Sequence, residues 1–388
     1  AAILATLGLL LSQIPTFMRP FLPQLQRTFV RGLSEADDIV RQRAAVALSA
    51  LIPLQPRLDP LVSELTTGIR QTDDLGIKLA MLRAIRAVAR APNANMLSPA
   101  SFQAIEDVVV SRSDVSASSD LRWRSLVSQA FGYLCAALPA EEASRLIIDH
   151  AVLVSGDSAD VQAGKLSFMA SVLSSAPRLF DGDMQKHIVD GVQTALQPSS
   201  SVEQGQAALQ AVAVTKNALL DQTVVLPASA VSALVDSLVR IVDPQTMVSY
   251  DTDVQHAALA TLKSLSKHRF AEVIKPTRDQ VVLAAMAHVR DRVVTVKLAA
   301  ERCLLYALRL AKVGEFDGDS DGLDEVVQNM GGPSSDKGKQ LVDYHRRVLC
   351  KLADMTRELD YISDDEDDKS NSAKTKLADL DDQADNSI

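Results

Sequence analysis

Aromatic side chains are scarce in this chain of 388 residues: Phe, Trp and Tyr together make up 4%, and Trp occurs once. Apolar residues nevertheless reach 47%, so Leu, Val and Ala must form most of the core. The strands of a β-sandwich would need more aromatic and β-branched residues in alternation with polar ones, and no sustained alternation is present. The composition therefore favours helices packed on helices.

Cysteine is also rare, and its three residues, Cys135, Cys303 and Cys350, lie far apart in apolar helical patterns. This usage fits a reduced, cytosolic setting in which each thiol serves as a small core hydrophobe. The apolar opening AAILATLGLLLSQI is too short to span a bilayer and lacks the basic flank of a signal peptide. We therefore expect no membrane partner. Because Ala1 already lies inside a helical pattern, we also expect the chain to be a piece of a longer protein.

Sequence motifs of nucleotide and metal sites are missing. The chain has no phosphate-binding G-x-x-x-x-G-K-[ST] and no dinucleotide-binding G-x-G-x-x-G, and its six histidines show no spacing suited to zinc. Asp317, Asp319 and Asp321 resemble the first half of a calcium loop, but Gln328 stands where a bidentate Glu should be. We therefore predict no catalytic residue, cofactor, metal ion or small-molecule substrate, and an enzyme is the less favoured alternative.

One helical pattern recurs along the chain. DDIVRQRAAVALSAL at 37–51 is matched 37 residues later by DLGIKLAMLRAIRAV at 74–88, and again by DTDVQHAALATLKSL at 251–265. Weaker copies fill the gaps, and seven anchor positions lie near residues 40, 77, 123, 161, 201, 254 and 296. Their spacings of 37 to 53 residues are typical of a repeat built from paired helices.

Each repeat is predicted to begin with a helix introduced by proline, whose missing N–H is not needed in a helix's first turn. Asp59 with Pro60 and Ser98 with Pro99 show this pattern, with Asp or Ser available as the N-cap. The second helix starts at an acid such as Asp37, which suits the positive end of the helix dipole and can pair with an Arg or Lys of a neighbouring unit.

Because one helix pair cannot bury both of its faces, we predict that neighbouring pairs stack into an all-α HEAT-repeat α-solenoid. The expected array is a right-handed superhelix of about seven helix pairs in residues 1–310, with a long groove. An acidic, Gly/Ser-rich loop insert is expected at 311–339, a C-terminal capping helix at 340–360 and a disordered acidic tail at 361–388.

The predicted tail holds nine acidic residues and three lysines, so it contributes −6 to the chain's net charge of −9. Ser363 precedes the run DDEDD, which makes it a candidate phosphosite for an acidophilic kinase. The alternative is a tail that only increases solubility.

Positive charge is concentrated at the other end, where residues 1–90 hold eleven Lys and Arg against seven Asp and Glu. Arg83, Arg86 and Arg90 lie at positions i, i+3 and i+7 of one helix, so they share a face, and Lys78 is nearby. These four residues are candidates for a docking stripe that binds an acidic partner or the phosphates of rRNA. The alternative is an ordinary solvated helix face.

Four stretches resemble a known family: MRPFLPQLQRTFVRGLSEADDIVRQRAAVALSALI, DPLVSELTTGIRQTDD, FGYLCAAL and DYHRRVLCKLAD. They are similar to the C-terminal HEAT repeats of the general control non-derepressible protein one (Gcn-one) family. The resemblance implies a cytoplasmic, ribosome-associated scaffold, not an enzyme, that helps activate the starvation-responsive kinase of initiation factor two alpha. It also implies docking of that kinase's RWD domain, for which Lys78, Arg83, Arg86 and Arg90 are the candidates. A transport receptor or a phosphatase regulatory subunit, built on the same repeats, is the alternative.

Overall fold

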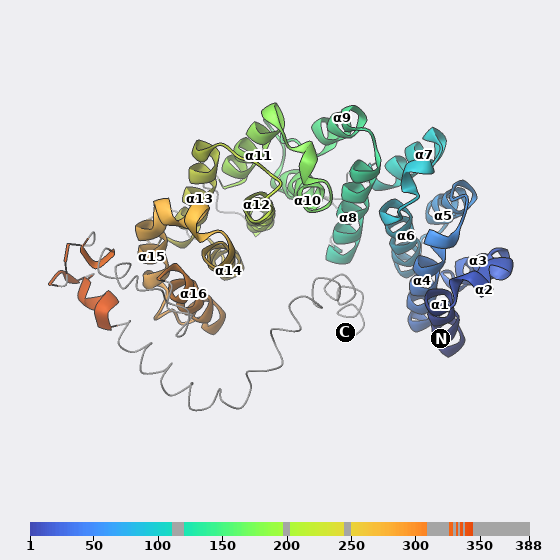
Figure 1. Cartoon of the computed structure of the whole chain (residues 1–388), viewed down its shortest axis with the longest axis horizontal. Coiled ribbons are helices and arrows are strands. Elements are labelled where there is room, and N and C mark those ends of the chain that lie inside the picture. Colours follow the sequence, from blue (N-terminus) through green and yellow to red (C-terminus); the bar gives the residue numbers. More distant parts are fainter. Residues whose placement is uncertain are drawn as a thin grey trace. The chain divides into compact units, whose positions relative to one another are not determined.

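The computed structural model describes residues 1–110, 120–196, 202–243 and 250–308, and short stretches between 326 and 343. The chain divides into two compact units, Ala1–Lys312 and Val313–Ile388. The first unit is built from helices throughout its described part (Figure 1). The helices are α1 (Ala2–Gln13), α2 (Pro15–Met18), α3 (Leu22–Gly32), α4 (Asp38–Leu51), α5 (Asp59–Gln71), α6 (Leu75–Arg90), α7 (Pro99–Val110), α8 (Leu121–Ala137), α9 (Ala140–His150), α10 (Ala159–Ser175), α11 (Gly182–Ala195), α12 (Val202–Leu220), α13 (Ala228–Val242), α14 (Thr252–His268), α15 (Arg278–Ala287) and α16 (Val294–Ala307).

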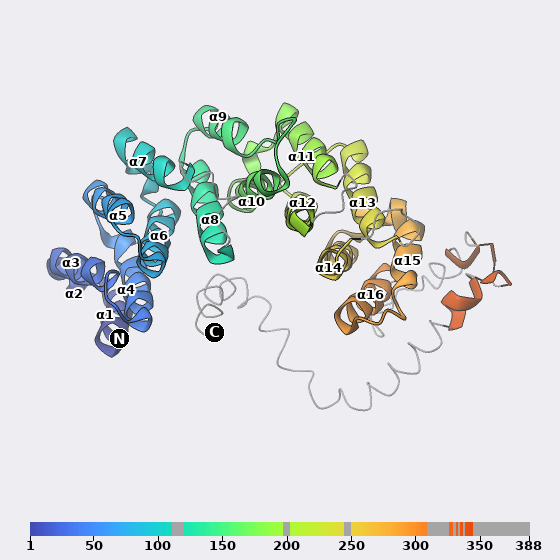
Figure 2. The same cartoon turned by 180° about the vertical axis from the view of Figure 1, so that it is seen from behind.

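The helices of this unit alternate between an outer and an inner row. Outer helices with odd numbers, from α3 to α15, each pack on the inner helix that follows, and inner helices also pack on one another from α4 to α16. The inner row lies on the concave side of the curved array, as both views show (Figures 1 and 2). These seven pairs confirm the predicted HEAT-type solenoid, and α1 packs on α4 like a further inner helix.

The apolar stripe predicted for the second helix of each repeat is buried. In α4, Ala44, Ala47, Leu48 and Leu51 are all closed off from solvent. The equivalent residues of other inner helices are also buried, namely Met81, Ala84, Ile85, Val88, Val127, Ala130, Phe131, Leu134, Phe168, Met169, Val172, Ala258, Leu262, Leu265, Val296, Ala300 and Leu304. Burial of these residues between neighbouring inner helices provides the main driving force for stacking.

The predicted register of α12 is wrong by three residues. An anchor at residue 201 would place Leu209 among the buried positions, but Leu209 is only half-buried, whereas Ala208, Ala211, Val212 and Thr215 are buried. The position equivalent to Val40 is therefore residue 204, not 201. The run GQAALQAVAV consists mostly of small residues, so the faces of this helix differ little in hydrophobicity. Its single Leu therefore indicates the wrong face as the buried one.

Aspartate is the N-cap of α4, α6, α8 and α14, as predicted, whereas Ser158 caps α10 and Val293 precedes α16 without a side-chain cap. The Asp37 carboxylate accepts the N–H of Ile39 at 2.8 Å, and the Asp74 carboxylate accepts the N–H of Ile77 at 3.0 Å. Asp120 caps α8 in the same way. Each cap satisfies backbone donors that the first turn of a helix leaves without partners.

The predicted pairing of basic residues with a neighbouring repeat holds only in part. Arg41 donates to the main-chain oxygens of Glu35 and Ala36 at 2.7 and 2.8 Å, within its own repeat. Arg124 of α8 does reach the next repeat, where its Nη2 lies 3.6 Å from a carboxylate oxygen of Asp160. A long Arg side chain can turn back to local carbonyls, so spacing in the sequence did not decide between the two arrangements.

Asp59 was expected to cap its own helix, but it joins two repeats instead. Its carboxylate accepts the N–H of Ser98 at 2.8 Å and the hydroxyl of Ser101 at 2.7 Å, at the start of α7. Leu58, not Asp59, is the N-cap residue of α5, and α5 has no side-chain cap. The hydrogen bonds from Ser101 and Ser98 lower the pKa of the Asp59 carboxyl from 3.8 to about 2.

Further hydrogen bonds join successive repeats at the turns. The Asn93 amide donates to the main-chain oxygen of Gln55 at 2.9 Å. Arg178 donates to the main-chain oxygen of Ala136 at 3.0 Å. Each bond satisfies a carbonyl near the end of a helix, and each ties one repeat to the preceding one.

Parts of the second unit are described separately. Residues 326–328 and 338–343 include helix, and Val326, Val327 and Leu341 are buried. The predicted insert at 311–339 is therefore not loop throughout. Residues 344–388 lie outside the described residues, and with them Ser363, Cys350 and most of the predicted capping helix.

No single described helix is long and apolar enough to cross a membrane. One bent pair, Ala2–Gln13 with Pro15–Gly32, meets the length and composition criteria together across a bend of 118°.

Replacement of Asp59 by Ala is expected to lower the free energy of unfolding near neutral pH by about 1–2 kcal/mol, because Ser98 and Ser101 lose a charged acceptor. Since the pKa in the folded state lies below the unfolded value, the contribution is complete above about pH 4 and is lost as the pH falls toward 2. Urea denaturation followed by circular dichroism at several pH values measures both effects.

The exposed Glu64 of the same helix supplies the matched control, Glu64→Ala. An equal loss of stability in the two variants, or a loss in Asp59→Ala that does not shrink below pH 4, would contradict this role of the carboxylate.

Candidate interaction surface

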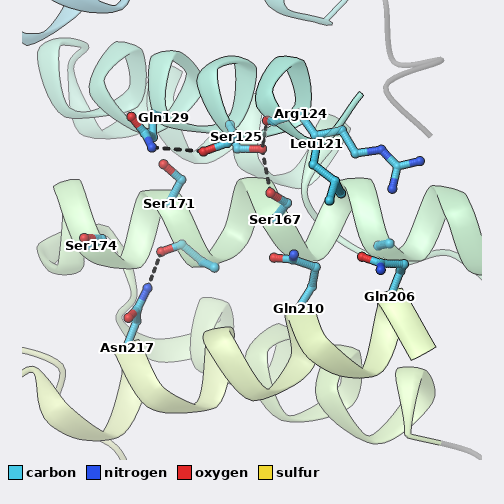
Figure 3. Close-up of a pocket in the computed structure, with 13 residues that line it drawn as sticks. Leu121, Arg124, Ser125, Gln129, Ser167, Ser171, Ser174, Gln206, Gln210 and Asn217 are labelled. Carbon is cyan, nitrogen blue, oxygen red and sulfur yellow. Dashed lines mark hydrogen bonds between the residues drawn. The ribbon is translucent and has the colours of Figure 1, made fainter. Parts of the chain in front are cut away.

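A polar trough crosses the concave wall of the first unit. It is a cavity of about 390 Å³ over α10, with one wall from α8 and the other from α12 (Figure 3). The lining residues are Leu121, Arg124, Ser125, Ser128, Gln129, Ala163, Ser167, Ala170, Ser171, Ser174, Gln206, Gln210 and Asn217. The trough exists because the residues that α10 turns to the concave side are Ala and Ser, which are shorter than the Gln and Asn side chains on the walls.

Some polar groups of the trough are held in place by the protein. The Gln129 amide accepts from Arg86 of α6 at 2.6 Å and donates to the Ser125 hydroxyl at 3.1 Å. On the opposite wall, the Asn217 amide donates to the main-chain oxygen of Ala170 at 2.8 Å. Because these bonds fix both amides, part of the trough is already ordered before a partner binds.

Other polar groups of the trough make no hydrogen bond within the described part of the chain. They are the hydroxyls of Ser171 and Ser174 and the amides of Gln206 and Gln210. Figure 3 shows the two glutamines extending from α12 toward α10. An amide side chain offers both donors and an acceptor, so these groups are free to bond with a partner or with water.

Close packing of α8 on α10 sets the depth of the trough on one side. A Cβ atom at Gly132 would lie 2.7 Å from the main-chain oxygen of Ser171, so only glycine fits there without movement. Phe131 stacks on Phe168 with ring centroids 4.5 Å apart, below the floor of the trough. Glycine thus allows an approach that larger residues would prevent.

The trough is close to neutral. Among the lining residues that the structure describes, Arg124 is the one charged residue, and it is paired with Asp160. A site that binds nucleic acid through its phosphates needs several uncompensated Lys or Arg side chains, which this lining does not supply.

The basic stripe predicted on α6 is changed by the structure. Lys78 is only 6% exposed, and its Nζ lies 3.9 Å from a carboxylate oxygen of Asp73, so it cannot reach a partner. The Lys78 side chain points back toward Asp73, before the start of α6, a direction that charge spacing alone did not reveal.

The three arginines of the stripe differ from one another. Arg83 is half-buried, and Arg86 is half-buried and bonded to Gln129. Arg90 is exposed and lies 5.9 Å from the centre of the Tyr133 ring. Arg90 also lines a second depression of about 500 Å³, together with Arg178. Arg90 is therefore the most exposed of the three arginines, and Arg86 helps to position Gln129 on the wall of the trough.

The buried cysteines behave as the sequence indicates. Burial raises the pKa of Cys135 and of Cys303 to about 12, so both remain neutral thiols within the core. Within residues 1–308, gaps excepted, and the short described stretches after them, no group of three or more His, Cys, Asp or Glu is placed to hold a metal ion.

The polar trough was not foreseen from the sequence. Ser167, Ser171 and Ser174 do share one helix face, but serines on a helix are usually only solvated, and the walls come from two other repeats. The segment GDSDG at 318–322 has the G-x-S-x-G form of a nucleophile elbow. It follows no strand-like segment, which that motif requires, and it lies outside the described residues.

A stack of helix pairs with a polar concave trough and a partly exposed basic helix defines an interaction scaffold of the HEAT-repeat class. Residues 59–365 match the family described as "Stalled ribosome sensor GCN1-like, HEAT repeats", and the chain belongs to this family.

The curated relatives agree with this assignment. The chain is 30% identical over 381 residues to "eIF-2-alpha kinase activator GCN1" of Saccharomyces cerevisiae, a match that covers 92% of this chain and 14% of the yeast protein. It is 34% identical over 202 residues to "Stalled ribosome sensor GCN1" of Homo sapiens, covering 49% of this chain and 7% of the human protein. The chain thus spans about a seventh of the yeast relative's length. Among solved structures, an engineered protein with 18% identity gives a TM-score of 0.39 over 94% of this chain and 91% of its own, too distant to add to the assignment.

Substitution of Gly132 by Ala is expected to lower the free energy of unfolding by about 1–3 kcal/mol, because the new Cβ collides with the main chain of Ser171. At Gly205 of α12 an added Cβ would meet nothing within 4 Å, so Gly205→Ala is the control. It should leave stability unchanged or raise it by up to about 1 kcal/mol through helix propensity. Thermal and urea denaturation measure both. If Gly132→Ala is as stable as Gly205→Ala, α8 and α10 are not held as close as described.

Proposed function

We propose that this chain is a non-catalytic scaffold of translation regulation that binds ribosomes and helps activate the starvation-responsive kinase of initiation factor two alpha. The observation that carries the proposal is the family match over residues 59–365. The yeast relative is named an eIF-2-alpha kinase activator, and the human relative a stalled ribosome sensor. Cytoplasmic localisation, in association with ribosomes, follows from the same proposal.

The geometry supports binding rather than turnover. Exposed polar groups lie on a wall of stacked helices, and the described cysteines are buried thiols of raised pKa, not nucleophiles. A scaffold of this kind acts by holding two partners together, which raises the effective concentration of one near the other. A transport receptor or a phosphatase regulatory subunit could use the same fold, but the family match favours the translational role.

Kinase docking is proposed for the exposed face of α6. Arg90 is exposed and Arg83 is half-buried there, and the spacing of seven residues puts both on one side of the helix. Lys78 is buried and is no longer a docking candidate. Arg86 is not proposed to contact the kinase. Its hydrogen bond to Gln129 stabilises the packing of α6 on α8. An acidic surface on the kinase's RWD domain would complement this face.

Charge reversal at Arg83 and Arg90 is expected to weaken binding of the RWD domain by at least about tenfold, since two attractive charges become repulsive. Isothermal titration calorimetry of the intact chain with the RWD domain measures the effect. The matched control reverses Arg57 and Arg290, which are exposed elsewhere in the array. Both double variants change the net charge equally, so a loss caused by overall charge alone would appear in both.

Three outcomes are distinguishable in this titration. Binding lost only in Arg83→Glu/Arg90→Glu supports docking on α6. If that variant still binds, α6 is not the docking face. If the intact chain does not bind the RWD domain, kinase docking on this chain is contradicted. Circular dichroism of each variant checks that the helices are retained.

A further inference from the structure

Polar side chains on the walls of the trough are spaced at a distance that matches the residue spacing of an extended polypeptide. Ser125 and Gln129 on one wall, and Gln206 and Gln210 on the other, are each four residues apart on a helix. Four residues of α-helix rise about 6 Å. Two residues of an extended chain rise about 6.6 Å, so every second residue of such a chain meets the next polar group of a wall.

The two walls of the trough can form hydrogen bonds with both edges of an extended chain. Successive residues of an extended chain direct their N–H and C=O groups to alternate sides, so one set faces α8 and the other faces α12. The amides on the walls can each donate and accept, as a peptide main chain also does. Gln206 and Gln210 have no bond of their own within the described residues, and Gln129 keeps a second N–H and a second lone pair.

The size of the trough sets the length of the ligand. Its floor runs along α10 from Ala163 to Ser174, and 11 helical steps correspond to about 16 Å. An extended chain covers that distance with about five residues. Short Ala and Ser side chains form the floor of the trough. We therefore expect ligand residues that face the floor to have small side chains, and bulky ones to be excluded.

Charge excludes the main alternative partners. Arg124 is the only charged residue in the described lining and is compensated by Asp160, so this lining offers no electrostatic site for a phosphate backbone or for a strongly acidic segment. A neutral extended peptide suffers no such penalty, because its recognition depends on hydrogen bonds to main-chain groups.

We propose that the trough over α10 binds an extended, uncharged polypeptide segment of about five residues through its main chain, with Gln129, Gln206, Gln210 and Asn217 as the reading side chains. This interaction goes beyond the kinase and ribosome contacts proposed above, and it uses a different surface from the α6 arginines. Arg86 positions Gln129 but does not itself touch the ligand.

The probe is an acetylated and amidated hexapeptide of alternating Thr and Ala, titrated to millimolar concentration into the isotope-labelled intact chain. Saturable changes in the NMR signals of α8, α10 and α12 are expected. Gln206→Ala/Gln210→Ala should weaken binding at least about tenfold, because two hydrogen bonds are removed. The control Gln71→Ala/Gln255→Ala removes two amides outside the trough and should leave binding unchanged.

An analogue of the hexapeptide methylated at every peptide nitrogen provides the sharpest comparison. It keeps the side chains and carbonyls but has no N–H donors, so its binding should be lost. The proposal is overturned if this analogue binds as well as the parent peptide, if the trough signals do not change, or if the double variant binds normally. Preferential binding of a uridine oligonucleotide at the trough would also overturn it. RWD binding measured with the α6 variants is a separate readout, so the two proposals can fail independently.

Discussion

The concave wall depends on one packing constraint: from α6 to α14, each inner helix buries its two flanks against the inner helices of the neighbouring repeats. The constraint is evident between α8 and α10, where Gly132 admits the main chain of Ser171 and Phe131 stacks on Phe168. Hydrogen bonds at the turns, such as those of Asp59 to Ser98, add directional links between repeats. A substitution that alters the packing between two inner helices therefore also alters the concave surface that these helices and their neighbours form.

This constraint also explains where binding chemistry can reside. Residues on the flanks of an inner helix are committed to packing, so the composition of its concave face is free to vary from repeat to repeat. At α6 that face carries Arg83 and Arg90, and at α10 it carries Ala and Ser, which open the trough. The bond from Arg86 to Gln129 connects the two surfaces through the joint of α6 with α8. The two proposed binding surfaces, for the RWD domain and for an extended peptide, are therefore adjacent parts of one wall.

Much of the fold could be predicted because it depends on local patterns. Ala44, Ala47, Leu48 and Leu51 share a helix face, and their recurrence 37 residues later identified the repeat. The pattern became unreliable where contrast was low, as at Leu209 in α12. The site could be predicted much less well, because side-chain direction and partners from other repeats are not encoded in local spacing. Lys78 was assigned to a surface although it is buried, and the trough requires three repeats to be placed side by side before it is visible.

If this chain works by binding partners on its concave wall, ribosomes should protect that wall. Hydrogen exchange measured by mass spectrometry, with and without purified ribosomes, tests this directly because it reports where backbone amides become protected. We expect added protection in the inner helices α6, α8, α10 and α12, with the outer helices α5, α7, α9 and α11 unchanged. Ribosome binding accompanied by protection confined to the outer helices would contradict this mode of action.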